Sequence, residues 1–363
     1  MPADVTTSSA SATPVCGAPR LESARGGQAR RRLILFGLLA LLVVCFLLSL
    51  CLGRYDISPL ESIGIIARSI TGDVSALDPI KINVVMSVRM PRILMALIVG
   101  GGLATAGATY QAVFGNPLVS PDILGVSSGA GFGAALGILL SGSILAIQGF
   151  ALGFGLLAVA LVILLGRVQK STQLYMLVLA GVIVGALFEA FISITKYVAD
   201  PNDQLPVITT WLMGSLASAS YRDVGIAAVV TLPCALVLMA LRWKLNLLSL
   251  DEEEARSLGV NVGRLRLAAI ALATFMTATS VSLCGIIGWV GLVIPHIGRM
   301  LVGNDHRALL PASLLLGASY LLLIDDVART LSQAEIPISI LTAIIGAPFF
   351  AYLLRRSGKK GSR

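Results

Sequence analysis

Long apolar runs recur along most of this chain, and they are long enough to cross a lipid bilayer. The first, residues 33–52, contains no charged residue, and about 20 such residues span the hydrocarbon core. Only 13% of the 363 residues are charged, whereas soluble domains carry roughly 25%. A helix satisfies its own backbone hydrogen bonds inside lipid. The sequence therefore predicts an all-α polytopic membrane protein.

Ten runs are predicted to be transmembrane helices. They cover residues 33–52, 93–113, 123–140, 144–165, 174–195, 224–241, 267–284, 286–302, 308–324 and 336–354. The division expected is a disordered cytoplasmic tail at 1–32, a transmembrane domain at 33–356 with a long loop at 242–266, and a basic cytoplasmic tail at 357–363. Most of the 27 Lys and Arg residues lie on the side of the two tails. The positive-inside rule therefore places both termini in the cytoplasm of a multi-pass protein.

Several classes of function are disfavoured. The net charge of +8 does not indicate a nucleic-acid partner, because the basic residues lie in short segments between apolar runs. The five cysteines have no metal-ligand spacing, so no metal site and no cofactor are expected. There is no phosphate-binding G-x-x-x-x-G-K-[ST] motif and no soluble catalytic domain. The chain is predicted not to be an enzyme, and any ATPase must be a separate subunit.

Glycine and proline interrupt two of the predicted spans. Asn116, Pro117 and Pro121 separate the second span from the third, and Gly291 and Pro295 punctuate the eighth. Proline removes a backbone donor and breaks a helix, and irregular backbone survives in a membrane only when it is buried in protein or lines a wet cavity. Each segment is therefore either a tight turn between helices or part of a transport pathway.

Two ionisable residues lie within or beside the apolar runs. Glu189 lies inside the fifth span, where an acid is rare and often functional, although a wet structural role near the outer end is equally compatible. His296 lies near the end of the eighth span, beside Arg299. We interpret this lone histidine as structural rather than as a metal ligand.

A short helix is predicted within the loop, at residues 249–259. Ser249 and Glu252 have the spacing of a capping box, and Gly259 suits the position just after a helix. So short a helix is unstable alone, so it must pack on its own loop or dock into a partner protein. The residues assigned to this contact are Leu250, Glu252, Ala255, Arg256, Leu258 and Gly259.

Three arginines, Arg89, Arg92 and Arg329, are predicted to lie at the outer ends of spans. This placement runs against the positive-inside rule. The side chains either snorkel to the membrane interface or attract an acidic soluble partner.

A series of short motifs resembles those of the FecCD-type permeases, the membrane subunits of bacterial ABC importers for ferric siderophores, haem and vitamin B12. The motifs follow the family order along residues 33–356. They begin at Val88, Gly115, Trp211, Ala255, Gly291, Asp305, Asp325, Glu335 and Gly346.

The resemblance implies the fold of the vitamin B12 importer permease, with ten spans in the bacterial cytoplasmic membrane. It also implies two ATPase subunits, a second permease subunit that is either identical or different, and an extracytoplasmic binding protein. Residues 249–259 would then form the coupling helix, the three arginines would dock the binding protein, and the fifth and tenth spans would flank the pathway. The expected cargo is a ferric siderophore, moved by alternating access.

Other functions remain open at this point. Cobalamin or haem could replace the siderophore, and an ion-coupled secondary transporter or a non-transporting scaffold are further alternatives. Three positions depart from the family pattern: Asp251, Glu189 and Asp326. Asp326 adds a charge next to Asp325, which we expect to weaken the attraction of Arg329 for a partner carboxylate.

Overall fold

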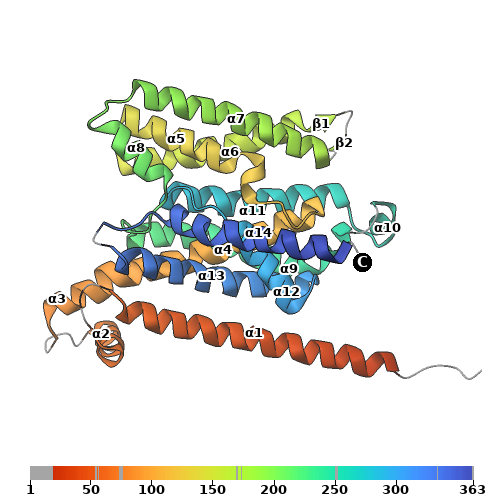
Figure 1. Ribbon diagram of the computed structural model, residues 1–363, viewed down its shortest axis with the longest axis horizontal. Coiled ribbons are helices and arrows are strands. Elements are labelled where there is room, and N and C mark those ends of the chain that lie inside the picture. Colours follow the sequence, from red (N-terminus) through yellow and green to blue (C-terminus); the bar gives the residue numbers. More distant parts are fainter. Residues whose placement is uncertain are drawn as a thin grey trace, which may run out of the picture.

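The computed structural model describes residues 19–53, 55, 57–72, 77–168, 171–172, 174–249, 252–332 and 334–361. Long helices run roughly along one axis of the molecule (Figure 1). Within the described ranges, the extended structure consists of one short antiparallel pair, β1 (Arg167–Val168) and β2 (Ser171–Thr172). The predicted all-α class is confirmed.

Seven helices are long and apolar enough to cross a membrane, and three shorter apolar helices accompany them in the part of the chain that the structure describes. The long helices are α1 (Pro19–Cys51), α4 (Met90–Phe114), α6 (Ile144–Leu165), α7 (Leu174–Val198), α9 (Tyr221–Asn246), α11 (Val262–Cys284) and α13 (His306–Thr330). The others are α5 (Val126–Leu140), α12 (Val290–Val302) and α14 (Ile338–Gly361). Together they account for the ten predicted spans.

Some helix boundaries differ from those predicted. Helix α1 begins at Pro19, so part of the segment expected to be a disordered tail is helical, while residues 1–18 lie outside the described residues. Helix α14 continues to Gly361 and takes in most of the predicted basic tail. Helix α12 begins at Val290 rather than at 286, because glycines precede it.

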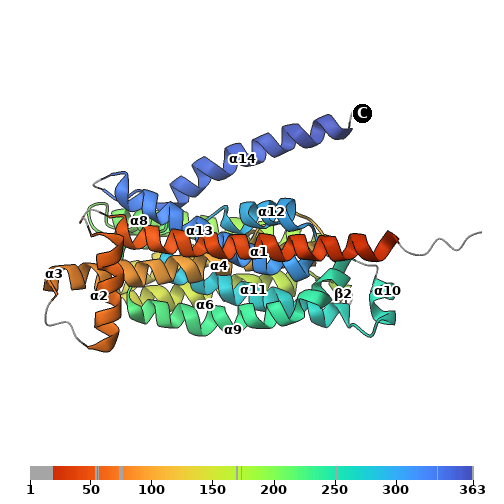
Figure 2. The ribbon, with the colours of Figure 1, turned by 90° about the horizontal axis from the view of Figure 1, so that it is seen from below.

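The two ends of the bundle carry different short elements. At one end lie α2 (Pro59–Thr71), α3 (Pro79–Ile82) and α8 (Gln204–Leu212); a π-helical segment, η1 (Asn83–Arg89), joins α3 to α4. At the other end lie the start of α1, the C-terminus and α10 (Glu252–Ser257), as Figures 1 and 2 show. Both ends of the described chain therefore lie on the same side, as an even number of crossings requires.

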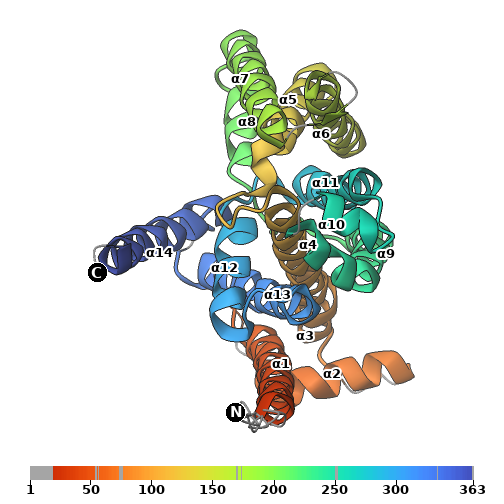
Figure 3. The same ribbon diagram turned by 90° about the vertical axis from the view of Figure 1, so that its right-hand side faces the viewer.

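Helix α4 lies at the centre of the bundle and packs against α9, α11, α12 and α13 (Figure 3). Most of its residues are buried, and many are Gly or Ala. Small residues allow helix backbones to approach closely in membranes. At the crossing of α4 and α13, Gly100 faces Gly317, and a side chain added at either position would overlap the other's carbonyl oxygen.

Helices α5, α6 and α7 form a second group beside this centre (Figure 3). Phe132 lies within 6 Å of Phe154, Phe188 and Phe191, measured between ring centroids. Such aromatic clusters add edge-to-face contacts to simple apolar burial. Helix α14 projects away from both groups (Figures 2 and 3).

The close crossing of α4 and α13 gives a test of packing. Gly317→Ala places a methyl group against the backbone of Gly100 and the side chain of Ala104, so we expect a loss of about 1–3 kcal/mol of stability from overpacking. Thermal unfolding of the detergent-purified chain measures this. The matched control is Gly149→Ala on α6, where the added methyl group meets no atom within 4 Å. Equal stability of the two variants would contradict the proposed packing.

Candidate functional site

Two stretches of non-helical backbone interrupt the bundle. The first leaves α4 at Gly115 (φ +62°) and reaches the 3-10 turn η2 (Pro121–Leu124) before α5 begins. The second leaves α11 at Gly285 (φ +71°) and ends where α12 begins. Helix α4 ends beside the last turn of α9, which leads to α10, whereas α11 ends beside α8. The two stretches therefore enter the bundle from opposite ends.

The two stretches meet in the middle of the bundle, against α4. A Cβ atom on Gly291 would lie 2.6 Å from Pro121 Cδ, and one on Gly107 would overlap the Gly291 carbonyl oxygen. The backbones of α4 and α12 and the ring of Pro121 are thus in direct contact. We call this contact, made by Gly107, Pro121 and Gly291, the central junction.

A small, mainly polar cavity lies at the central junction. Its polar lining comes from Ser120, Asp122, Ser127 and Thr277. The Ser127 hydroxyl donates a hydrogen bond to the Asp122 carboxylate, and Asp122 is exposed. Sequence reasoning did not single out Asp122 as a site residue, although an acid directly after a proline inside an apolar run is a recognisable signal.

Trp289, the residue directly before α12, has an unusual backbone conformation. Its φ of +70° is the one positive value for a non-glycine residue in the described ranges. Bulky residues rarely adopt this conformation, and such strain often marks functional positions. The indole lies flat against Gly346 of α14, where a Cβ atom would be 2.5 Å from a ring carbon. Its ring centroid lies 6.2 Å from that of Phe350. Trp289 therefore joins the second interrupted stretch to α14.

His296 continues this contact between α12 and α14. Its ring lies 6.2 Å from Phe349 and 5.9 Å from Phe350, centroid to centroid. The described residues contain no cluster of His, Cys, Asp or Glu that could hold a metal ion. The aromatic environment favours the structural interpretation of this histidine.

The residues predicted for the interrupted segments fall into two groups. Pro121, Gly291 and Pro295 are buried, the first two at the central junction and the third about one turn further along α12. Asn116 and Pro117 are exposed at the end of the bundle, where the Asn116 side chain accepts a hydrogen bond from the Leu118 N–H at 2.9 Å. Asn116 and Pro117 therefore form a tight turn. Pro121, in the same segment, lies at the central junction, where a role in the transport pathway stays a prediction.

Glu189 is exposed on α7 and forms no ion pair among the described residues. The preceding residue, Phe188, packs against Phe132 and Phe154 in the interior. Glu189 is therefore placed on the outer surface of this helix and not within the core of the chain. The role predicted for it in the pathway stays a prediction.

The arginines predicted to face a partner are buried inside the chain. Arg92 is 6% exposed, and its guanidinium binds both carboxylate oxygens of Asp325 at 2.8–2.9 Å and Glu335 at 2.9 Å. These bonds connect α4 to α13 and to the segment before α14. Charge-assisted bonds of this two-pronged kind are strong and directional.

Arg329 and Arg89 hold the end of α1. Arg329, 7% exposed, binds Asp326 and the backbone carbonyl of Ser49. Arg89, 3% exposed, donates to the carbonyls of Leu50 and Cys51 in the last turn of α1. Helix carbonyls at a C-terminus lack partners and carry partial negative charge, so a cation there stabilises the helix end.

The exposure expected of docking residues is therefore absent at Arg89, Arg92 and Arg329 in this conformation. Asp325 and Asp326 account for two of the three, since each is buried and pairs with a different arginine, Arg92 or Arg329. The pairing of Asp326 with Arg329 agrees with the weakened attraction expected from the sequence, whereas the pairing of Asp325 with Arg92 was not predicted.

Helix α10 occupies the position predicted for the short loop helix. Gly259 has a φ of +77°, and the Val260 N–H bonds the Ala255 carbonyl, which is a glycine-capped helix end. Ala255 is fully buried in the core of its own chain, whereas Leu258 is 56% exposed. Leu250 and the side chains of Ser249, Glu252 and Arg256 lie outside the described residues.

Asp305, at the α10 end of the bundle, joins α1, α9 and α13. Its carboxylate binds Arg31 of α1 at 2.7 Å and the Asn246 side chain at the end of α9 at 2.9 Å, and it caps α13 through the Arg307 N–H. Desolvation alone raises the pKa of this carboxyl, but the hydrogen bonds from Arg307, Asn246 and Arg31 outweigh it and hold the pKa below its usual value. Asp305 thus stays ionised and connects three helices.

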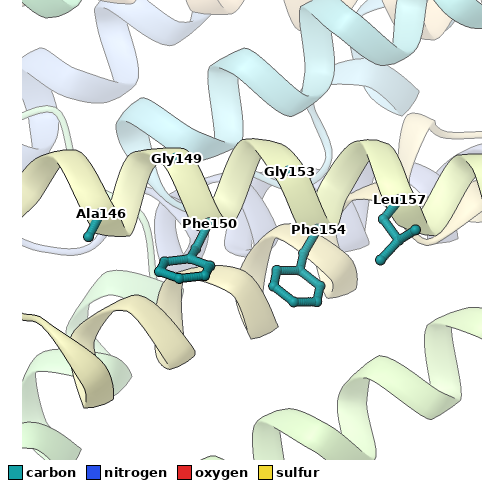
Figure 4. A pocket seen from close by; sticks show the side chains of 6 residues that line it. All are labelled: Ala146, Gly149, Phe150, Gly153, Phe154 and Leu157. Atoms are coloured by element: carbon teal, nitrogen blue, oxygen red, sulfur yellow. The ribbon is translucent and has the colours of Figure 1, made fainter.

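Two of the larger cavities among the described residues lie on α6 and beside α8, away from the central junction. One, of about 360 Å³, is an apolar groove on α6, where Phe150, Phe154 and Leu157 project from the same side of the helix (Figure 4). It offers no polar group to a charged cargo. The other, of about 480 Å³, lies between α8 and the end of α11 and is lined partly by Thr210, Ser215 and Ser218.

Comparison with known proteins identifies the architecture. Residues 41–356 match the FecCD transport family. This chain belongs to that family. The chain is 46% identical to the molybdate import system permease protein MolB of Haemophilus influenzae over 90% of this chain and 97% of that one. It is 39% identical to a probable iron chelatin transport system permease of Helicobacter pylori, over 76% and 83% of the two chains.

A solved structure agrees with the fold. It is described as an inward-facing conformation of a putative metal-chelate type ABC transporter, with a TM-score of 0.80 and 46% identity. The match covers 89% of this chain and 99% of the other. This FecCD chain is therefore an ABC importer permease, a multi-pass membrane protein with the fold that its motifs implied.

Replacing Arg92, which forms a buried ion pair with Asp325, distinguishes a structural role of this arginine from a docking role. Arg92→Met leaves Asp325 buried without its partner, so we expect a loss of about 3–5 kcal/mol in stability, measured by thermal unfolding of the purified permease without any binding protein. The control is Arg68→Met on α2, an exposed arginine. Unchanged stability of Arg92→Met would favour a docking role alone.

Proposed function

We propose that this permease moves a metal-containing anion or chelate into the cytoplasm by alternating access, driven by two copies of a separate ATPase. The observation that carries the proposal is the central junction. Two irregular stretches from opposite ends of the bundle meet at Gly107, Pro121 and Gly291, beside a cavity that contains Asp122. Interrupted helices at mid-membrane depth are typical of transport sites.

The orientation that supports import has both termini and α10 in the cytoplasm. The Lys and Arg bias favours it, and both ends of the described chain lie on the α10 side (Figure 1). The outer end would then carry α2, α8 and the 480 Å³ cavity, and an extracytoplasmic binding protein would deliver the cargo there. A second permease subunit, identical or different, would complete the pathway beside α7 and α14. The surfaces of these helices that face away from the rest of the chain expose the apolar side chains of Ile183, Leu187, Ile344 and Ile345.

Two cargo classes are supported, and molybdate is the first. The relative named for molybdate import shares 46% identity over almost its whole length. A ferric siderophore is the second, favoured by the relative named for iron chelatin transport and by the volume of the outer cavity, about 480 Å³. A large chelate requires a weakly binding passage, and the low charge of the predicted spans agrees with this requirement.

Uptake by the reconstituted complex tests the importer and its cargo together. Proteoliposomes that contain the permease and its ATPase, supplied with the binding protein, should accumulate radiolabelled molybdate or a ferric siderophore only with ATP inside. An ATPase variant that binds but does not hydrolyse ATP is the control. Uptake that survives this variant and follows an ion gradient instead would show a secondary transporter.

The coupling role of α10 has its own test. Leu258 is exposed and is expected to enter a cleft of the ATPase, so Leu258→Asp should weaken ATPase binding about tenfold or more, as loss of a central apolar contact does. Co-purification of the two subunits measures it. Arg355→Asp, at an exposed position on the same end, is the control. Ala255→Asp is less specific, because Ala255 is buried in its own chain. Full retention of the ATPase by Leu258→Asp would contradict the coupling role.

A further inference from the structure

A pocket with several polar side chains in its wall lies at the α10 end of the bundle, apart from the central junction. It has a volume of about 340 Å³, room for about ten waters at 30 Å³ each. We call it the basal pocket. Its lining residues include Gln111, Asn246, Arg299, Asn304 and His306. These residues come from α4, α9, α12 and the turn into α13.

Arg299 gives the basal pocket a positive charge that no described carboxylate neutralises. One of its nitrogens donates to the Gln111 side-chain carbonyl. It forms no ion pair with a carboxylate among the described residues. This is the reverse of Arg92, whose guanidinium is held by two acids. A partly desolvated cation without a counter-charge favours an anion from outside the chain.

Gln111 supplies the second observation. Its side chain is 2% exposed, and its Nε2 has no hydrogen-bond partner among the described residues. Because its carbonyl already accepts from Arg299, the amide is oriented with both N–H donors free. A buried donor without a partner costs about 1–3 kcal/mol, so a bound group that accepts these hydrogens would remove the cost.

His306 and Asn246 complete the wall. Asn246 Oδ1 accepts from the His306 backbone N–H and lies 2.8 Å from its Nδ1. This bond assigns the ring proton to Nδ1, which leaves Nε2 as an acceptor that no described residue contacts with a donor. The nearest acid in sequence, Asp305, is engaged by Arg31, Asn246 and the Arg307 N–H. It therefore does not supply the counter-charge to Arg299.

We propose that the basal pocket binds a tetrahedral oxyanion between Arg299 and the Gln111 amide. Phosphate, sulfate and molybdate share this chemistry, as does the phosphate of an anionic lipid headgroup. Such an anion would bridge α4 and α12 beside the end of α9, the helix that leads to α10. The proposal goes beyond the importer role and does not depend on which cargo is carried.

Equilibrium dialysis with radiolabelled phosphate, and separately molybdate, tests the site. The permease–ATPase complex is placed in nanodiscs of phosphatidylcholine, without nucleotide. We expect saturable binding, with Arg299→Gln weakening it about tenfold or more, as loss of a charge-assisted hydrogen bond predicts. Arg299→Lys should retain part of the affinity, and the exposed Arg355→Gln should match the wild type.

A second variant guards against misfolding of Arg299→Gln. Asn304 is exposed at the pocket rim, so Asn304→Asp keeps the shape of the side chain and adds a repelling charge. It should lower the affinity several-fold while the melting temperature stays unchanged. Absence of saturable binding to the wild type would overturn the proposal, as would binding by Arg299→Gln and Asn304→Asp that equals binding by the wild type.

The source of the anion is distinguished by lipid composition. If the natural occupant is a lipid headgroup, nanodiscs that contain phosphatidylglycerol should suppress binding of free phosphate to the wild type, and a headgroup should co-purify with wild type but not with Arg299→Gln. If it is a free anion, lipid composition should have no effect. Failure of molybdate uptake by proteoliposomes would contradict only the proposed cargo. It would not bear on the proposed anion site in the basal pocket.

Discussion

Every backbone N–H and carbonyl inside the membrane must find its partner within the protein, and the arrangement of this chain follows from that requirement. Helices satisfy it internally, but the two interrupted stretches cannot. Segments between helices bond to helix ends instead. The Ser215 N–H bonds the Cys284 carbonyl at the end of α11, and the N–H groups of Ile338 and Ser339 bond the carbonyls of Gly214 and Met213. Residues 213–215 therefore join the end of α11 to the start of α14.

Close approach of these irregular segments requires residues without side chains. Gly214 and Gly285 both have positive φ, and a Cβ atom on Gly214 would lie 2.5 Å from the Ile286 carbonyl oxygen. Gly107 and Gly291 allow the same close backbone contact at the central junction. The glycines are thus of two kinds, those that permit a backbone conformation and those that permit contact. A sequence shows both kinds as the same letter.

The sequence predicted the ten-span architecture well, because apolar length is a local property. It also located the interrupted segments and the glycine-capped end of α10. Sequence reasoning did not reach the contacts that join residues far apart in the chain. Arg92 and Asp325 are separated by more than 200 positions, so nothing local showed that the arginine is neutralised. The same holds for Ala255, whose burial depends on helices on both sides of the loop.

The attachment of α14 has a mechanical consequence. Hydrogen bonds from other segments reach this helix only at its first residues, Ile338 and Ser339, in the part of the chain that the structure describes. Further along, contact with α12 is made by rings, those of Trp289, His296, Phe349 and Phe350. Aromatic faces can slide without breaking a directional bond. Directional bonds therefore fix the first turn of α14, and the ring contacts further along allow the helix to pivot about that turn.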